Sequence, residues 1–268
     1  MNISVVITFF NKGGVLIQAV ESVYAQIGRN DEIIIVDDCS STELSHEVLI
    51  KAKRKFKTKI KFFKTPDNGG AAYAKDYGVR RSSNEIIVLL DADDTLPNGA
   101  INKIKNKFNT DKETDLVFGN YIKRDLDKDK YELVDCGILV ENGSLNPEVL
   151  IKKWVLLGSS PFKKTVYIQL GGFDKFYPKT DDVDFHKKLL VKGYKCSYVN
   201  DVIYIWNKSI TGNNARQTME DRFFSEMRNI EFHYRFSSIM MVGVFFLKNF
   251  VRAVYLRIIK NRDNSFLN

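Results

Sequence analysis

Apolar runs alternate with helical repeats along the first 120 residues of the chain. Short runs rich in β-branched residues predict buried strands at residues 3–8, 32–36, 60–63, 86–90 and 115–119. Between these runs, the sequence predicts helices near residues 16–23, 43–56, 71–82 and 98–108. Strands that alternate with helices form a parallel sheet with right-handed crossovers. The pattern therefore predicts an α/β fold with a mostly parallel central sheet flanked by helices.

The pattern is weaker after residue 120. Residues 120–145 are charged and are expected to form a loop or a hairpin, and a break is expected at Gly158 to Pro161. The remaining predictions are a helix at 147–158, a helix at 181–192 and two short strands within 194–206. His186 is expected on the surface of its helix.

A basic, amphipathic pattern marks the end of the chain. Apolar residues within 238–262 share one helical face, and basic residues lie mostly on the other. Such a helix can lie on an anionic membrane surface. Packing on the preceding domain or on a second copy is the alternative. The longest apolar run, near 239–247, is too short for a bilayer, which needs about 20 residues.

The composition is that of an ordinary globular protein. The chain has 268 residues, of which 44% are hydrophobic and 12% aromatic, and the aromatic content excludes disorder. Its three cysteines are far apart and support neither a disulfide framework nor a zinc site, which is typical of a reducing compartment. The N-terminus lacks the basic region and cleavage site of a secretory signal. A cytoplasmic location is therefore expected.

The net charge of +8 is unevenly distributed. Residues 46–64 carry eight Lys and Arg against one Glu, and residues 235–262 carry six and no acid. Anionic partners are therefore expected: a nucleotide, a membrane surface or nucleic acid. No nucleic-acid recognition motif accompanies residues 46–64, so a solvated helix face is favoured there and no nucleic acid is expected as a partner.

Polar residues follow four of the predicted strands. They lie at residues 8–11, 37–38, 68–70 and 91–94. In a parallel sheet the ligand site lies outside the carboxyl ends of the strands. These four segments are far apart in the sequence but are expected to converge at one edge of the sheet.

The acidic run Asp91-Ala92-Asp93-Asp94 directly follows a predicted strand. Three carboxylates at one strand end repel one another unless a cation or hydrogen-bond donors offset their charge. Mn²⁺ and Mg²⁺ prefer such oxygen ligands and complete their shell with water or substrate phosphates. The alternative is a solvated acidic turn that caps the next helix.

Two further strand ends offer ligand contacts. A carboxylate at Asp37 or Asp38 can accept from a base or a ribose hydroxyl, or can simply cap the next helix. Residues 68–70, Asn-Gly-Gly, allow close backbone approach before a helix N-terminus, which favours phosphate or sugar contact. Phe10 can stack on a base, although a core position is the alternative.

A second acidic group opens the predicted helix at 181–192. Acids are common in a first helical turn, so capping is the simple interpretation of Asp181, Asp182 and Asp184. A general base, however, needs a carboxylate that stands in a cleft. Asp182 is the candidate, and the Gly171-Gly172 turn before it can place this helix over the site.

These stretches together resemble the family 2 glycosyltransferases of the GT-A fold. The matching segments are VVITFFN (5–11), EIIIVDDCS (32–40), DNGGAAYAKDYGV (67–79), EIIVLLDADD (85–94), GGFDKFY (171–177) and DDVDF (181–185). The resemblance implies a nucleotide-diphospho-sugar transferase fold at residues 1–212. Residues 1–120 would bind the nucleotide sugar and residues 121–212 the acceptor, with a helical extension at 213–268.

The resemblance also implies roles for individual residues. The residues implied to bind the nucleotide sugar are Thr8, Phe10, Asn11, Asp38, Asn68, Gly70, Lys75, Asp91 and Asp93. The metal would be Mn²⁺ or Mg²⁺ on Asp93 and Asp91, with Asp94 as an alternative ligand. Asp182 would be the catalytic base. The residues implied to lie on the acceptor side are Gly158, Ser159 and Asp181.

The chain departs from the family pattern at four places. It has Thr8-Phe9-Phe10-Asn11 where Pro-Thr-Tyr-Asn is commoner, and Lys75-Asp76 where Arg-Asn is usual. Asp181 replaces the usual Glu, and Asn207 stands near the place of a frequent His.

The implied reaction is inverting transfer of a sugar from a nucleotide diphosphate, UDP above all, to a hydroxyl group. The acceptor would be a glycan or a lipid-linked molecule in bacterial envelope polysaccharide synthesis, at the inner face of the cell membrane. A nucleotidyltransferase on a similar fold and a basic nucleic-acid-binding protein are the alternatives.

Overall fold

The computed structural model describes residues 1–208, except for 57, 143, 153–154, 157 and 174–180. The described elements belong to one compact unit, Met1–Arg216. The predicted amphipathic helix within 238–262 lies outside the described residues. Among the helices that are described, none has the length and hydropathy to cross a bilayer.

Four parallel strands form the N-terminal half of the sheet, in the order β3-β2-β1-β4. They are β1 (Ile3–Phe9), β2 (Glu32–Asp37), β3 (Ile60–Lys64) and β4 (Ile86–Asp91). Every residue of β1 and β2 is buried, because helices cover both faces of this part of the sheet. The four predicted strands are confirmed, each to within one residue at either end.

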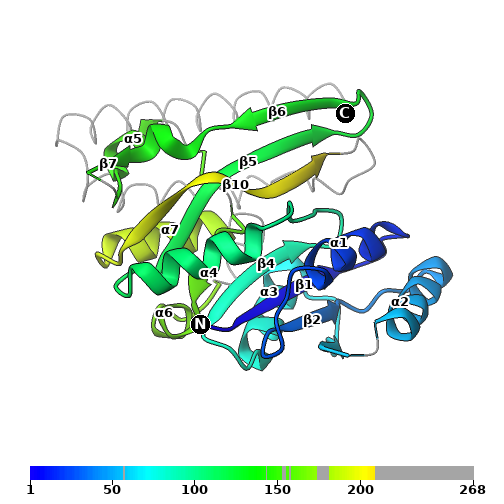
Figure 1. The fold of residues 1–268 in the computed structure, drawn as a ribbon. Helices are drawn as coiled ribbons and strands as arrows, with labels where there is room; N and C mark the ends of the chain where they lie inside the picture. Colours follow the sequence, from blue (N-terminus) through cyan, green and yellow to red (C-terminus); the bar gives the residue numbers. More distant parts are fainter. Residues whose placement is uncertain (57, 143, 153–154, 157, 174–180, 209–268) are drawn as a thin grey trace, which may run out of the picture. The chain divides into compact units, whose positions relative to one another are not determined.

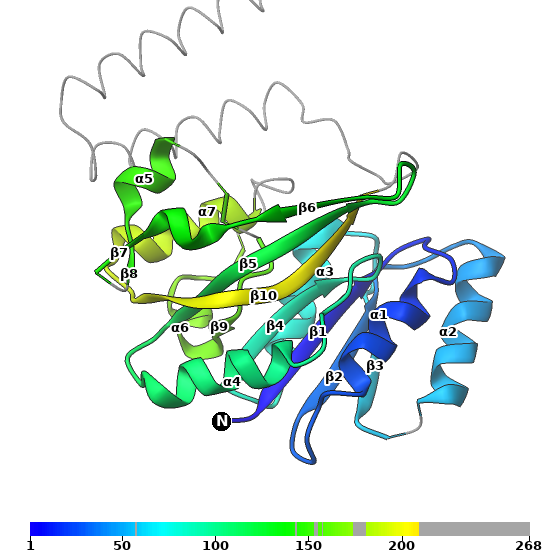
Figure 2. The ribbon, with the colours of Figure 1, turned by 45° about the horizontal axis from the view of Figure 1, so that its top comes forward.

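Helices connect these strands as the sequence predicts. They are α1 (Val15–Tyr24), α2 (Glu43–Lys55), α3 (Gly70–Arg81) and α4 (Ala100–Thr110). Figure 2 shows α1 and α2 on one face of the sheet and α3 on the other. On α3, Gly78 allows the helix to approach β1 closely: a Cβ there would lie 2.4 Å from Val6 Cγ1.

The second half extends the sheet with strands of both directions. The long strands β5 (Leu116–Asp125) and β10 (Cys196–Lys208) run parallel and side by side (Figure 1), and β6 (Lys130–Val134) forms the predicted hairpin with β5. The short strand β9 (Phe162–Lys163) pairs antiparallel with both β4 and β5. At the far edge lie β8 (Ser144–Leu145) and β7 (Val140–Glu141). The sheet is therefore mixed, with parallel strands dominating its N-terminal half.

Three predictions in the second half were wrong in detail. In place of two short strands within 194–206 there is one strand, β10 (Cys196–Lys208), whose register with β5 shifts between Val199 and Val202 and again between Val202 and Tyr204. These irregularities break the alternation of side chains, which made one strand resemble two. The helix predicted at 147–158 is the shorter α5 (Pro147–Lys152).

The third correction concerns α7 (Asp181–Val191), where His186 is only 1% exposed instead of lying on the surface. Burial lowers the pKa of His186 to about 4, although the nearby charge of Asp182 opposes this shift. Its imidazole is therefore neutral at pH 7. The sequence also gave no indication of β9 or of α6 (Lys164–Gln169), since both are too short to show a periodicity.

Candidate functional site

Asp38 organises the loop that leads into α3. Its Oδ1 accepts hydrogen bonds from Thr65 Oγ1 at 2.9 Å and from Gly69 N at 3.1 Å, and its Oδ2 accepts one from Gly70 N at 2.7 Å. Asn68 Nδ2 donates to the Asp38 carbonyl at 3.2 Å. Three of the predicted site residues, Asp38, Asn68 and Gly70, are thus brought together. In this structure the buried Asp38 carboxylate holds the glycine turn in place.

Asn11 connects two neighbouring strand ends. Its backbone N–H donates to Ser40 Oγ at 3.0 Å, and its Oδ1 accepts from Ser41 N at 2.9 Å and Thr42 N at 3.2 Å. Asn11 has a positive φ of 46°, which asparagine tolerates better than most residues. The polar side chain of Asn11 is therefore used to fix the loops after β1 and β2.

Two carboxylates of the acidic turn after β4 face solvent and are paired with lysines. Thr8 Oγ1 donates to Asp91 Oδ1 at 3.1 Å, and Lys75 Nζ lies 3.5 Å from the same oxygen. Lys12 Nζ lies 2.5 Å from Asp93 Oδ2. The side chains of Asp91 and Asp93 are 42% and 32% exposed, so both carboxylates remain accessible to a ligand.

The third acid of the turn, Asp94, points into the protein. It is 4% exposed, and its two oxygens accept from Tyr204 OH at 2.7 Å and from Asn207 N at 2.8 Å. Burial, and then the charge of Asp91, raises the pKa of Asp94 well above its usual range. Asp94 was expected as an alternative metal ligand. In the structure, both of its carboxylate oxygens accept hydrogen bonds from β10.

Asp182 lies directly against the loop before β9. A Cβ on Gly158 would come within 1.8 Å of Asp182 Oδ2, so only glycine leaves room for this carboxylate. The neighbouring Ser159 donates from Oγ to Tyr204 OH at 3.3 Å. Asp182, Gly158 and Ser159 are therefore brought together, and Tyr204 connects their loop to Asp94. Asp181 opens the same helix as Asp182.

An aromatic cluster fixes the helix that carries Asp182. The rings in mutual contact are Phe162, Tyr167, Phe173 and Phe185, with neighbouring centroids 5.1 to 5.7 Å apart. Tyr167 OH donates to Asp76 Oδ1 at 2.9 Å and accepts from Phe173 N at 3.1 Å. Burial raises the pKa of Tyr167 above its ordinary value. Asp76, one of the departures from the family pattern, thus supports the turn that precedes α7.

Comparison with known proteins identifies the family. The sequence model described as glycosyl transferase family 2 matches residues 4–167, which is more than half of the chain. The chain belongs to glycosyl transferase family 2. The match covers the parallel strands, the acidic turn and the loop at 158–160.

Relatives of this family 2 chain include proteins from two bacteria. Glycosyltransferase GlyG of Streptococcus pneumoniae is 34% identical over 123 residues, which are 46% of this chain and 40% of GlyG. The teichoic acid poly(glycerol phosphate) polymerase of Staphylococcus epidermidis is 28% identical over 107 residues, 40% of this chain and 15% of that protein. The chain therefore spans less than half the length of either relative.

The fold of this chain also matches a solved structure. The structure of S. aureus TarS residues 1–349 in complex with UDP-GlcNAc superimposes with a TM-score of 0.70 at 15% identity. The superposition covers 87% of this chain and 66% of that one. This similarity establishes that the family 2 chain has the GT-A-like α/β fold expected from its sequence.

The accessible carboxylates of the family 2 chain, Asp91 and Asp93, fit a divalent cation that takes its other ligands from a substrate. Asp91 and Asp93 supply hard carboxylate oxygens. Asn207 lies beside them, where its Nδ2 donates to the Asp93 carbonyl at 2.8 Å, and its buried Oδ1 accepts no hydrogen bond from a described residue. No group of three or more His, Cys, Asp or Glu side chains in the described part of the chain could hold a metal alone. Substrate oxygens would therefore have to complete the shell.

Three residues of this site were missed or only partly recognised in the sequence. Lys12 and Tyr204 were not predicted to take part, and Asn207 was noted only as a departure. Lys12 follows Asn11 in a polar turn at a strand end, which is a usable signal. Tyr204 carries none, because an aromatic residue in an apolar strand is indistinguishable from ordinary core.

Proposed function

We propose that this chain transfers a sugar from a UDP-sugar to a hydroxyl group of a glycan or a lipid-linked acceptor, with inversion at the anomeric carbon. Family membership supports sugar transfer. The similar TarS structure contains UDP-GlcNAc, which supports a UDP-sugar as donor. The teichoic acid polymerase among the relatives supports a role in the bacterial cell envelope. Such an acceptor would be met at the cytoplasmic face of the membrane.

One arrangement carries the proposal. The accessible acids Asp91 and Asp93 follow β4, while Asp182 belongs to α7, about 90 residues further on. The loop against which Asp182 packs shares hydrogen bonds with Tyr204 and, through it, with the acidic turn. This connection between the loop beside Asp182 and the acidic turn supports a base and a diphosphate site that serve one reaction.

In the proposed reaction, Asp182 accepts the proton of the acceptor hydroxyl while that oxygen attacks the anomeric carbon. The bond from the anomeric carbon to the diphosphate oxygen breaks, and UDP leaves with the electron pair. A single displacement of this kind inverts the configuration. Asp91 and Asp93 would hold Mn²⁺ or Mg²⁺, which when bound neutralises charge on the diphosphate. Thr8 orients the Asp91 carboxylate through its hydroxyl.

The loops after β1, β2 and β3 are proposed to receive the nucleotide. Thr8 and the half-buried Phe10 lie at the end of β1, beside the loop that Asp38 organises. Gly70 N begins α3, and Lys75 on this helix brings a positive charge to Asp91. A base on the β1 side and a diphosphate near Lys12 and Lys75 would match the charge of these loops.

The decisive experiment measures UDP release by the purified chain from a panel of UDP-sugars with Mn²⁺. Asp182→Asn keeps the size of the side chain but removes the base, so turnover should fall by about 10² to 10⁴-fold while UDP affinity stays within about twofold. Asp201→Asn is the matched control, since Asp201 is exposed and its carboxylate is bonded to Lys103 and to the backbone N–H of Val202. Its turnover should equal that of the unmodified chain.

Product analysis separates this proposal from its rivals. A sugar transferase releases UDP, whereas a nucleotidyltransferase releases free pyrophosphate. Near-full turnover of Asp182→Asn would exclude Asp182 as the base. Failure of every UDP-sugar to bind, together with salt-sensitive binding of random DNA, would favour the basic nucleic-acid-binding alternative.

A further inference from the structure

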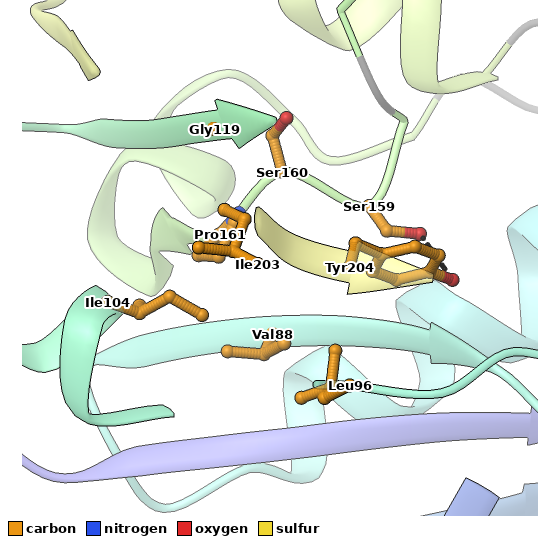
Figure 3. A pocket seen from close by; sticks show the side chains of 9 residues that line it. All are labelled: Val88, Leu96, Ile104, Gly119, Ser159, Ser160, Pro161, Ile203 and Tyr204. Atoms are coloured by element: carbon orange, nitrogen blue, oxygen red, sulfur yellow. Dashed lines mark hydrogen bonds between the residues drawn. The ribbon is translucent and has the colours of Figure 1, made fainter. Parts of the chain in front are cut away.

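A buried chain of hydrogen bonds runs from the acceptor-side loop to the acidic turn. Ser159 Oγ donates to Tyr204 OH at 3.3 Å, and Tyr204 OH donates to Asp94 Oδ2 at 2.7 Å. Figure 3 shows Ser159 and Tyr204 with their hydroxyl groups facing each other. All three side chains are at least nine-tenths buried, with exposed fractions of 8%, 2% and 4%. Bulk solvent is therefore largely excluded from these bonds.

The strand that carries Tyr204, β10, contacts the acidic turn on both sides of Asp94. Asn207 on β10 donates from its backbone N to Asp94 Oδ1 and from Nδ2 to the Asp93 carbonyl, both at 2.8 Å. Just beyond the turn, Thr95 and Ile205 exchange two backbone hydrogen bonds of 3.2 and 2.9 Å. The position of Asp93 is thus set by β10 through Asp94 and Asn207.

The Tyr204 hydroxyl forms hydrogen bonds with both Ser159 and Asp94. Its single proton goes to Asp94, so it can meet Ser159 only as an acceptor. Hydrogen bonds in a buried series polarise one another, so the bond that Tyr204 accepts from Ser159 strengthens the bond that Tyr204 donates to Asp94. Any movement of Ser159 therefore changes the hydrogen bonding of Tyr204 and, one step further, of Asp94.

We propose that Tyr204 is a positioning residue that couples the acceptor-side loop at 158–160 to the donor-binding turn at 91–94. The proposal rests on the proposed function in one respect: that function assigns the acceptor to the loop at 158–160 and the donor to the turn at 91–94. Occupation of the acceptor side would tighten the turn that holds the diphosphate, and loss of the Ser159 bond would loosen it. Tyr204 touches neither substrate and acts through Asp94.

A cavity beside these hydrogen bonds determines which substitution at Tyr204 is suitable for the test. It is lined by Ser159, Tyr204 and apolar residues such as Val88 and Leu96, and it has room for about one water molecule (Figure 3). Truncating Tyr204 to Ala would enlarge this cavity and unfold the region for unrelated reasons. Tyr204→Phe removes only the hydroxyl and is the appropriate variant.

The test is a double-mutant cycle on the full chain, with UDP and Mn²⁺ as the probe in calorimetry. We expect Ser159→Ala to weaken UDP binding about threefold and Tyr204→Phe about tenfold. The double variant should bind no more weakly than Tyr204→Phe alone, because Ser159 acts only through the hydroxyl. Tyr198→Phe is the matched control: its hydroxyl, on the same strand, donates to Asn120 at 2.8 Å, and its removal should leave UDP affinity within twofold.

A second readout needs no ligand. In the nucleotide-free chain, amide hydrogen exchange at Asp94 and Thr95 should speed up at least fivefold in Tyr204→Phe and also in Ser159→Ala, but not in Tyr198→Phe. Additive effects in the cycle, or unchanged exchange at the turn, would overturn the coupling even though UDP binds. Failure of the unmodified chain to bind UDP would count against the proposed function instead, and the exchange measurement would still decide the coupling.

Discussion

At the scale of single residues, the absence of a side chain at position 158 is what gives Asp182 its place. The Asp182 carboxylate occupies the space that a Cβ would take, 1.8 Å from its Oδ2. Real Cβ atoms do not approach an oxygen so closely, so one of the two must move. A carboxylate can act as a base only when it is held near the proton that it accepts.

Gly158→Ala should therefore displace Asp182 and lower turnover by about 10-fold or more, while UDP affinity falls by no more than about threefold, the change expected for loss of the neighbouring Ser159 bond. The measurement is kcat for UDP release together with the Kd for UDP. Asp201→Asn again serves as the control, since Asp201 is an exposed residue of β10. If Gly158→Ala slowed Asp182→Asn by the same factor, the effect would not act through Asp182.

Lys12 is the residue that a cation at Asp93 must displace. Its Nζ lies 2.5 Å from Asp93 Oδ2, and both side chains are about one-third exposed. A partly exposed ion pair of this kind stabilises the folded protein by up to about 1 kcal/mol. The ammonium would therefore compete with the proposed Mn²⁺ ion in the protein without nucleotide.

Lys12→Met should raise Mn²⁺ affinity about two- to fivefold in the absence of nucleotide, because Asp93 no longer has a cationic partner. Manganese titration followed by electron paramagnetic resonance measures this directly. Lys103→Met is the control: it breaks a similar exposed pair, with Asp201 at 2.6 Å, away from the acidic turn. Equal or weaker Mn²⁺ binding in Lys12→Met would show that the two cations do not compete.

At the scale of elements, the N-terminal half could be predicted because its strands are buried on both faces. Continuous apolar runs such as Ile33–Val36 can only be central strands once turn residues bound them. The four polar strand ends then converge as a parallel sheet requires. In β10, by contrast, register shifts near Val202 interrupt the alternation, and one strand of thirteen residues resembled two.

The candidate site was predictable only as far as single residues announce their chemistry. Asp91 and Asp93 stand out as carboxylates after a buried strand, and Asp182 as an acid that opens a helix. Their partners lie far away in the sequence: Tyr204 is 110 residues from Asp94, and Lys12 is 81 residues from Asp93. Such pairings follow from tertiary packing and leave no local pattern. Asp38 shows the reverse case, since its proposed ligand-binding carboxylate also holds the Gly69-Gly70 turn.

At the scale of the whole described unit, the short strand β9 joins the two halves of the sheet. Its two residues pair with β4 on one side and with β5 on the other. Phe162 on this strand is 1% exposed and its ring lies 5.2 Å from that of Tyr167 and 5.1 Å from that of Phe185 on α7. Phe162 therefore provides a direct contact between the sheet and the helix that carries Asp182.

Phe162→Ala should consequently loosen α7 as well as lower overall stability. Removal of a buried phenylalanine ring costs about 3–5 kcal/mol of the free energy of unfolding, measured in urea. Phe108→Ala, at a 0% exposed position on α4, is the matched control and should cost a similar amount. Amide exchange at Phe185 to Leu190 should rise by more than the change in global stability explains in Phe162→Ala, and kcat should fall while UDP affinity is kept.

The same exchange pattern in both variants would show that α7 is held independently of β9. Because the larger truncation removes much of the 5–15 kcal/mol by which a typical domain is stable, Phe162→Leu supplies a milder version of the same change. It keeps the site apolar but cannot stack on Tyr167. It should therefore preserve folding while still raising exchange at α7, since the helix depends on the ring contacts more than on the volume that fills the core.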